Sequence, residues 1–238
     1  MKNLTSLLAL TVFLSTAAAA QQIGKAIPLE TEIAAVDLGG RFVRIPAPDR
    51  FTDTMLLFPR IAGRLIASES PLNEVLAVHV TDDILPQLRN GDEPDLPFFT
   101  KVSVLKQLRS ADVEPDFQAI KTEFEKQSPG MLQSVVSSGE KGAGERLSKH
   151  WGGETNLKIG ETRSLGYFDK QPESISALFV MNLEIFDRKM VILGSMSLVH
   201  VNKRLLYVYV FRIPTSDNDQ NIVTNFTKAW TAKLIAAN

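Results

Sequence analysis

The chain has 238 residues, with 26 Lys and Arg against 27 Asp and Glu, so its formal net charge is −1. No stretch concentrates basic residues, and without such clustering binding to phosphates loses the counterion release that drives it, so we expect no nucleic-acid partner. The sequence contains no Cys, which excludes a disulfide scaffold and leaves stability to an ordinary apolar core.

The N-terminus has the pattern of a cleavable secretory signal. Lys2 supplies the positive start, residues 4–16 form an apolar run, and Ala18 and Ala20 are the small residues of a cleavage site. The apolar run is shorter than the roughly 20 residues that a membrane-spanning helix needs. We therefore expect residues 1–20 to be a signal peptide.

Removal of this signal would leave residues 21–238, which are long enough to bury one substantial core. We expect a single α+β domain over this range, with a possible flexible segment at the glycine-rich stretch 139–153. No later stretch is long and apolar enough to cross a bilayer, and no Cys is present for lipid attachment. The predicted location is therefore periplasmic or secreted, with no membrane span.

The first predicted elements are two short strands, at 32–36 and 41–45. They flank a turn at 37–40 whose two glycines can adopt positive φ. Pro46 and Pro48 end the second strand. A hairpin is therefore expected near the start of the folded domain.

A helix is predicted next, over residues 54–68. Phe58, Ile61 and Leu65 would share one of its faces, and a proline lies near its first turn. Residues 55–58 are also compatible with a strand, so the start of this helix stays open.

The middle of the chain alternates between strand and helix patterns. The clearest helix signal is the apolar stripe formed by Phe117, Ile120 and Phe124. The predicted elements are a strand at 74–81, a helical turn near 82–88, a loop at 90–97, a strand at 98–105, a helix at about 114–126 and partial helix within 131–150.

Three consecutive strands are predicted near the C-terminus, at 176–186, 190–201 and 204–213. The short links between them force antiparallel neighbours. The last strand is apolar on both faces, so it needs cover on both faces. This predicts an α+β fold with a mainly antiparallel sheet covered by helices on both faces, a three-layer sandwich.

A helix is predicted after the last strand and would supply one of these layers. Ser216 is its expected N-cap, with Asp219 in the capping-box position. A partner-binding helix is the alternative to packing on the sheet. The apolar stripe recurs at steps of three and four residues and comprises Val223, Phe226, Trp230, Leu234 and Ala237.

A family resemblance follows from these features. An early strand ending in Ile-Pro-Ala-Pro, a run of antiparallel strands and a capped C-terminal helix with a tryptophan resemble the PsbP/Mog1-type α/β/α sandwich of exported bacterial proteins. The stretches VHVNKRLLYVYVFR and NFTKAWTAKLIAAN carry the resemblance, over about the last fifty residues. That family is functionally diverse, so the resemblance implies a fold and transfers no catalytic residue.

One stretch partly matches the motif of a serine nucleophile, Gly194-Ser195-Met196-Ser197-Leu198. A nucleophile elbow requires a second glycine where Leu198 stands, and it lies at a strand-to-helix turn. This stretch falls inside a predicted strand. Ser195 and Ser197 are therefore expected to be ordinary strand serines.

The sequence has three histidines: His79, His150 and His200. None has a partner at the spacing that places two imidazoles on one helix face. Each is expected to be a packed or surface residue, although the three could still converge in space. His150 beside Trp151 in a glycine-rich stretch is the more interesting pair, because an aromatic residue on a loop can line a site.

Two further motifs are incomplete. Residues 217–221 resemble a calcium loop, but Ile222 and Lys228 replace the required Gly and Glu, so a helix cap is expected instead. Residues 139–144 lack the terminal Gly-Lys-Ser/Thr of a phosphate-binding loop. We therefore predict no catalytic, cofactor-binding or metal-binding residue, and no cofactor.

Two functions remain open from the sequence. The first is a non-catalytic binding or accessory module of the cell envelope, with an unknown protein or small-molecule partner. The second is an exported hydrolase whose catalytic residues are dispersed along the chain. A deep pocket with a histidine beside an acid or a serine would favour the hydrolase, and a flat apolar patch would favour the binding module.

Overall fold

A computed structural model describes residues 35–126, 143–151, 157–185 and 188–238. The predicted signal peptide at 1–20 lies outside the described residues, as do both ends of the predicted flexible segment at 139–153. Among the residues that are described, no helix combines the length and the apolar character needed to cross a membrane.

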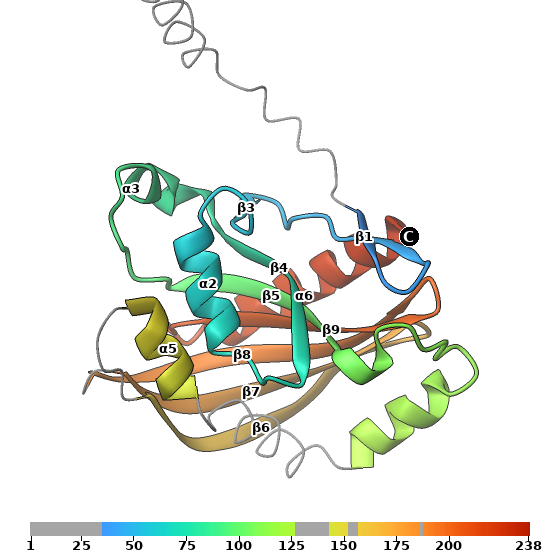
Figure 1. The fold of residues 1–238 in the computed structure, drawn as a ribbon. Helices are drawn as coiled ribbons and strands as arrows, with labels where there is room; N and C mark the ends of the chain where they lie inside the picture. Colours follow the sequence, from blue (N-terminus) through green and yellow to red (C-terminus); the bar gives the residue numbers. More distant parts are fainter. Residues whose placement is uncertain (1–34, 127–142, 152–156, 186–187) are drawn as a thin grey trace, which may run out of the picture. The chain divides into compact units, whose positions relative to one another are not determined.

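The main sheet has seven strands in the order β3-β4-β5-β9-β8-β7-β6, and all neighbours are antiparallel (Figure 1). The structure is therefore α+β with a large antiparallel sheet, as predicted. The strands are β3 (Phe51–Asp53), β4 (Asn73–Thr81), β5 (Phe98–Leu105), β6 (Leu157–Gln171), β7 (Ser174–Ile185), β8 (Arg188–Val201) and β9 (Arg204–Arg212).

The C-terminal meander of β7, β8 and β9 is confirmed. Asn202 and Lys203 link the last two strands with φ of 47° and 68°, the pair of positive angles that a two-residue hairpin turn requires. The other predicted turn includes residues 186–187, which lie outside the described part of the chain.

The long edge strand β6 was not predicted from the sequence. Its pairing with β7 shifts register three times, and Gly166 adopts a φ of 100°. Each shift changes which side chains face the core, so the alternation that signals a strand is lost.

The predicted N-terminal hairpin is present as a separate two-stranded antiparallel sheet of β1 (Ala35–Asp37) and β2 (Phe42–Arg44). Gly39 and Gly40 form its turn with φ of 64° and 80°. Leu38 is fully buried in the main core. The hairpin is therefore packed onto the domain.

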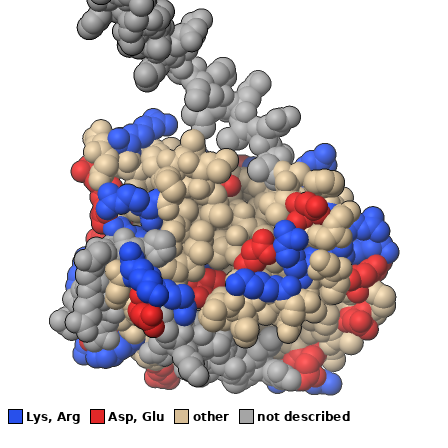
Figure 2. Space-filling model, viewed as in Figure 1, with Lys and Arg blue, Asp and Glu red and all other residues tan. Residues whose placement is uncertain are grey.

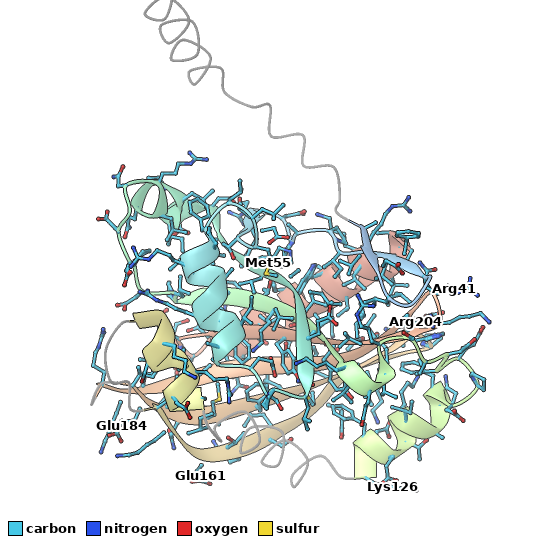
Figure 3. All side chains as sticks on the ribbon, viewed as in Figure 1. Arg41, Met55, Lys126, Glu161, Glu184 and Arg204 are labelled. Atoms are coloured by element: carbon cyan, nitrogen blue, oxygen red, sulfur yellow. The ribbon has the colours of Figure 1, made fainter. Side chains whose placement is uncertain are left out.

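Arg204 holds this hairpin against β9 (Figure 3). Its Nε donates to the Leu38 carbonyl at 2.7 Å and its Nη2 to the Gly39 carbonyl at 3.1 Å. Nη1 donates to the Ala111 carbonyl at 3.0 Å. A buried guanidinium thus binds the backbone of two other segments, which fixes where the hairpin lies.

Among the described helical elements, the C-terminal helix is the longest. The described helical elements are α2 (Pro59–Ala67), the 3₁₀ turn η1 (Asp82–Ile84), α3 (Leu85–Arg89), the 3₁₀ turn η2 (Lys106–Leu108), a helix at 117–126, α5 (Ala143–Trp151) and α6 (Asp219–Ala236).

The predicted helix at 54–68 is wrong over its first residues. The preceding residues form β3, and the Met55 amide donates to the Asp53 carboxylate at 2.8 Å, which closes a turn instead of starting a helix. Helix α2 begins only at Pro59, the position where a proline is best tolerated. Residues 55–58 form neither the predicted helix nor the alternative strand.

The predicted helix at 114–126 begins later, at residue 117. The Glu114 amide donates to the Asp112 carboxylate at 3.1 Å, so the chain turns at this point before the helix starts. Phe117 and Phe124 are buried, as the stripe predicted.

The start of the final helix also differs in detail. Helix α6 begins at Asp219, and its N-cap, Asn218, makes no side-chain cap. The Asp219 carboxylate accepts bonds from the Thr215 and Ser216 amides, each at 2.6 Å. The predicted acid therefore reaches back to the Ser216 amide as in a capping box, but Ser216 is not itself the cap.

One apolar cluster forms between the sheet and α6, which packs across β8 and β9 (Figure 1). It includes Leu206, Val208 and Val210 of β9 together with Trp230 and Leu234 of α6. The apolar stripe of the final helix therefore packs within the molecule, as predicted.

A second apolar cluster contains the alternate side chains of β9. Leu205 and Tyr209 lie in it together with Phe117 and Phe124. Because neighbouring residues of a strand point to opposite faces, the two clusters contact opposite faces of β9.

Charged side chains are interspersed on the face drawn in Figure 2, where basic and acidic groups lie close together around an uncharged area. Among the described residues, Lys101 and Glu69 form a buried ion pair at 2.5 Å. The Lys101 ammonium also lies 5.5 Å from the centre of the Tyr209 ring, a cation–π contact that compensates in part for its burial.

Candidate functional site

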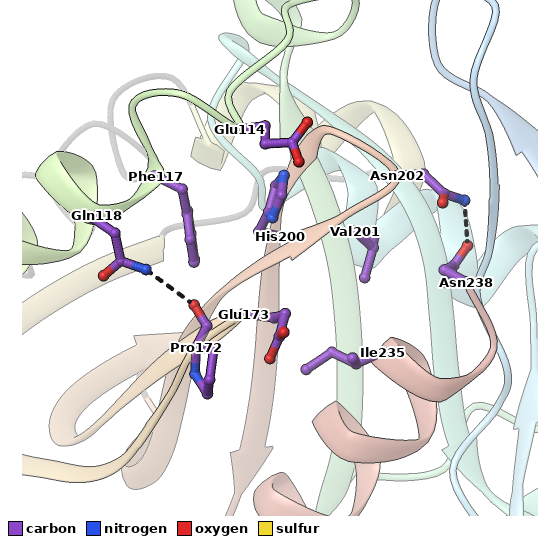
Figure 4. A pocket seen from close by; sticks show the side chains of 10 residues that line it. All are labelled: Glu114, Phe117, Gln118, Pro172, Glu173, His200, Val201, Asn202, Ile235 and Asn238. Carbon is purple, nitrogen blue, oxygen red and sulfur yellow. Dashed lines mark hydrogen bonds between the residues drawn. The ribbon is translucent and has the colours of Figure 1, made fainter.

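A pocket of about 450 Å³ opens at the end of the sheet where two hairpin turns meet (Figure 4). Four separate segments line it: residues 114–118, the turn between β6 and β7, the end of β8 with its following turn, and the end of α6. This volume is within the usual range for small-molecule sites. The pocket is therefore the candidate functional site.

The side-chain amides in the lining of this pocket are bonded to the backbone of neighbouring segments. Asn238 donates to the Arg44 carbonyl at 2.9 Å and accepts from the Arg44 amide at 2.8 Å. Asn202 donates to the Phe42 carbonyl at 2.8 Å. Gln118 makes a longer bond, 3.4 Å, to the Pro172 carbonyl. These amides therefore have structural partners already.

His200 lies inside the pocket and is held by packing. Its ring stacks on Phe117, with 5.1 Å between ring centres and 28° between planes. Its backbone amide donates to the Glu173 carbonyl at 2.8 Å. The Nε2 atom is buried and has no hydrogen-bond partner among the described residues. The imidazole is thus positioned without a hydrogen bond from its ring to a described carboxylate.

Two glutamates bring negative charge to the pocket. Glu114 pairs with Lys203 at 3.0 Å, and Lys203 also pairs with Asp112 at 3.2 Å. These two partners raise the pKa of Lys203 above its usual value. Glu173 has no ion pair or side-chain hydrogen bond with any described residue, and none of the lining residues is Lys or Arg. Of the two glutamates, Glu114 is therefore paired with a lysine and Glu173 is not.

His79 has a different environment, within the core. It is fully buried, with Nδ1 3.0 Å from the Thr100 hydroxyl and its ring edge-on to Trp230 at 5.5 Å. Burial penalises the charged imidazole and lowers the pKa of His79 to about 3. The expectation of a packed strand histidine is confirmed here.

His79 and His200 do not share one site. His79 pairs in register with Thr100, which pairs with Val210, whereas His200 pairs with Leu205. Val210 and Leu205 point to opposite faces of β9, so the two imidazoles lie on opposite faces of the sheet. His150 and Trp151 belong to α5, but their side chains lie outside the described part of the structure.

Ser195 and Ser197 are interior residues of β8, as expected. The Ser195 hydroxyl lies 2.7 Å from the Thr227 hydroxyl, and the Ser197 hydroxyl lies 2.7 Å from that of Ser176. Both serines are fully buried. Neither is accessible to a substrate, and neither stands at a strand-to-helix turn.

The segment 217–221 comprises the turn before α6 and the first residues of that helix, where Asp219 bonds back to the preceding amides. Burial raises the pKa of the Asp219 carboxyl, but the hydrogen bonds from Arg212, Thr215 and Ser216 outweigh this and lower that pKa to about 2. Within the described ranges, no group of three or more His, Asp or Glu side chains is arranged to hold a metal ion.

Sequence reasoning named His200 and Phe117 separately and missed the pocket that joins them. It also missed Glu114 and Glu173 as pocket residues. No local signal could have found them, because the pocket exists only where four distant segments meet. The tight turn between β8 and β9 could be predicted, and it places His200 near the end of a strand.

The chain matches no protein family, no curated protein and no solved structure. Its function is therefore inferred from the chemistry of the pocket and from the pattern of its N-terminus.

Proposed function

We propose that the protein is exported and serves as a non-catalytic binding or accessory module of the cell envelope. Export is supported by the signal-peptide pattern of residues 1–20. The binding site in this proposal is the pocket around His200, which has the volume of a small-molecule site.

The observation that carries this proposal is how His200 is held. A catalytic imidazole is usually oriented by a hydrogen bond from a third group and contacts a nucleophile. In the described structure His200 is held by Phe117 instead, and its Nε2 bonds to no described group. No Ser, Thr, Lys or Tyr is among the described residues that line the pocket. These residues supply polar groups for binding, but they do not include a nucleophile beside an oriented base.

A three-layer sandwich of the PsbP/Mog1 type is the fold proposed with this function. It is supported by the two apolar clusters on β9, one with residues of α6 and the other with residues of the helix at 117–126. A module of this kind presents its pocket at the end of a rigid sheet, so ligand binding would need little rearrangement.

Native mass spectrometry of protein purified from the extracytoplasmic fraction of the producing cell tests the binding function. We expect a non-covalent small-molecule adduct that is released chemically unchanged on denaturation. Glu173→Trp would place a bulky side chain at the pocket and should remove the adduct, whereas Asp92→Trp, in the exposed loop after α3, should retain it. An adduct that persists in Glu173→Trp would contradict binding at this site.

A hydrolase is the second candidate, and one observation favours it: His200 shares its pocket with Glu114 and Glu173. Chromogenic ester, peptide, glycoside and phosphoester substrates can be tested with purified protein and with His200→Ala. Turnover that depends on His200 would favour the hydrolase. We expect no such turnover.

A further inference from the structure

Two leucines are exposed side by side in the turn between β3 and α2. Leu56 is 90% exposed and Leu57 is 57% exposed, and no other large apolar side chain among the described residues is as exposed as Leu56. A single exposed leucine is ordinary on a protein surface, but adjacent ones mark an interaction surface. Figure 2 shows an uncharged area on this face, and Figure 3, drawn in the same view, labels Met55 within it.

The turn that carries these leucines is fixed at both ends. Thr54 is fully buried, and its amide and hydroxyl donate to the Val78 carbonyl at 2.8 and 3.0 Å. The Phe58 amide donates to the Thr54 carbonyl at 2.9 Å, and the Phe58 ring packs against an apolar cluster with side chains of α2 and β4. The two leucines lie between these anchors. A partner would therefore meet a surface that is already formed.

Charged groups of opposite sign come before and after the two leucines. On the β3 side, Asp53 is half-buried and Asp82 is exposed, and neither carboxylate forms an ion pair with a described residue. On the α2 side, Arg60 is exposed and shares the Glu93 carboxylate with Arg64, so the charge of Arg60 is only partly neutralised. The turn thus separates an acidic side from a basic side.

This charge pattern fits a second copy of the same chain. A two-fold axis through the leucines reverses the direction of the chain, so the acidic side of one copy would meet Arg60 of the other. Arg50 and Asp83 add one exposed charge of each sign on the β3 side, which leaves that side acidic. An anionic bilayer surface would repel it.

We propose that the turn with Leu56 and Leu57 is a dimer surface, on which two copies of the chain pair about a two-fold axis. The leucines of both copies would be removed from water, and the opposite charges would fix how the copies align. The apolar part comprises few side chains, so the dimer is reversible and its interface is small. None of these residues lines the pocket around His200, so the inference does not depend on the binding function proposed above.

Sedimentation velocity of the purified protein between about 1 and 200 μM, at low ionic strength, tests the dimer. We expect a monomer–dimer equilibrium with a dissociation constant of roughly 10–100 μM. Leu56→Asp should raise this constant about tenfold or more. Leu72→Asp changes a leucine that is 64% exposed outside the turn and should leave the constant unchanged. Both leucines are exposed, so both variants should fold, and thermal melting checks this.

A monomer at every concentration would overturn the proposal, as would a dimer that Leu56→Asp leaves intact. Equal weakening by Leu56→Asp and Leu72→Asp would also overturn it, because the contact would then not be specific to the turn.

Neutral variants test how the two copies align. Asp53→Asn keeps an oxygen that can accept from the Met55 amide, and Arg60→Gln changes an exposed side chain. Each should weaken the dimer by about three- to tenfold. Because both remove the same ion pair between the copies, the double variant should weaken it little further. Additive losses would overturn the proposed contact between Asp53 and Arg60 of the second copy.

Co-sedimentation with phosphatidylcholine vesicles, and with vesicles that also contain phosphatidylglycerol, tests the bilayer as the alternative occupant. We expect the protein to stay in the supernatant with both. Vesicle binding that Leu56→Asp abolishes, by a protein that remains monomeric in solution, would overturn the dimer and assign the turn to a lipid surface.

Discussion

His79 combines complete burial with a titratable ring. In the folded protein burial lowers its pKa to about 3, whereas an unfolded chain has a histidine pKa of about 6.5. The unfolded state therefore binds the proton first. The contribution of His79 to the free energy of unfolding is therefore constant above about pH 6.5. It falls as the pH drops towards 3, by up to roughly 1.4 kcal/mol per pH unit.

The predicted consequence is a measurable acid sensitivity. Between pH 7.5 and 5.5, His79 should reduce the free energy of unfolding by about 1.4 kcal/mol. His79→Phe keeps an aromatic ring beside Trp230 and should remove this part of the pH dependence. Urea denaturation at the two pH values measures the free energy of unfolding. His200→Gln is the control variant and should keep the pH dependence of the wild type. If the free energy of unfolding changed equally between the two pH values in wild type and in His79→Phe, another group would be responsible.

None of the histidines is expected to be essential for function. If deletion of the gene produces a phenotype, chains with His79→Ala, His150→Ala or His200→Ala should each restore it, provided that each variant is folded and exported. Loss of a catalytic histidine typically lowers a rate by about 10²–10⁴-fold, so complementation would detect it. Failure of a well-folded His200→Ala variant would favour the hydrolase.

Among the helices, α6 contributes most to the core through Trp230. This side chain is 2% exposed, and its Nε1 donates to the Pro46 carbonyl at 2.9 Å. The bond ties the helix to the segment after the N-terminal hairpin. Replacing the Trp230 side chain with a small one removes both a large apolar volume and the donor of a buried hydrogen bond.

We expect Trp230→Ala to lower the free energy of unfolding by about 3–5 kcal/mol. Lys233→Ala is the control on the same helix. Its ammonium pairs with Asp49 at 2.6 Å, but the pair is exposed and such pairs contribute about 0–1 kcal/mol. Thermal melting of both variants measures the difference. Comparable small changes would mean that α6 is peripheral to the fold.

The strands differ in how well their sequences predicted them. The hairpin of β8 and β9 has a two-residue turn between two long apolar runs, so its place could be predicted. Strand β6 could not, because its register shifts remove the alternation. At residues 55–58 an apolar run suggested regular structure, but the Asp53 carboxylate stabilises a turn there. Local hydrogen bonds of this kind override propensity.

At the scale of the whole molecule, the fold class was predictable and the candidate site was not. An antiparallel sheet follows from short links between strands, which is local information. The pocket depends on residues 114–118 reaching the end of α6, and nothing in either segment specifies the other. Only the arrangement of the sheet brings Glu114 and Glu173 to one place.

Export is the remaining prediction at this scale. The mature protein should lack residues 1–20 and should be recovered outside the cytoplasm without detergent. Intact-mass spectrometry is the suitable measurement, because an N-terminal Gln21 can cyclise and block sequential degradation. Full-length, membrane-bound protein as the main species would refute the signal-peptide interpretation.

The order of the strands also sets when the chain can fold. Strand β5 pairs with β9, from Phe98 with Arg212 to Ser103 with Tyr207. The centre of the sheet therefore joins two segments that the ribosome synthesises about a hundred residues apart. Closing such a loop is entropically unfavourable, and contacts of this range slow folding. During synthesis β5 has no partner on one side until β9 emerges. A chain stopped before Arg204 would expose that edge, and we expect it to aggregate instead of forming a smaller domain.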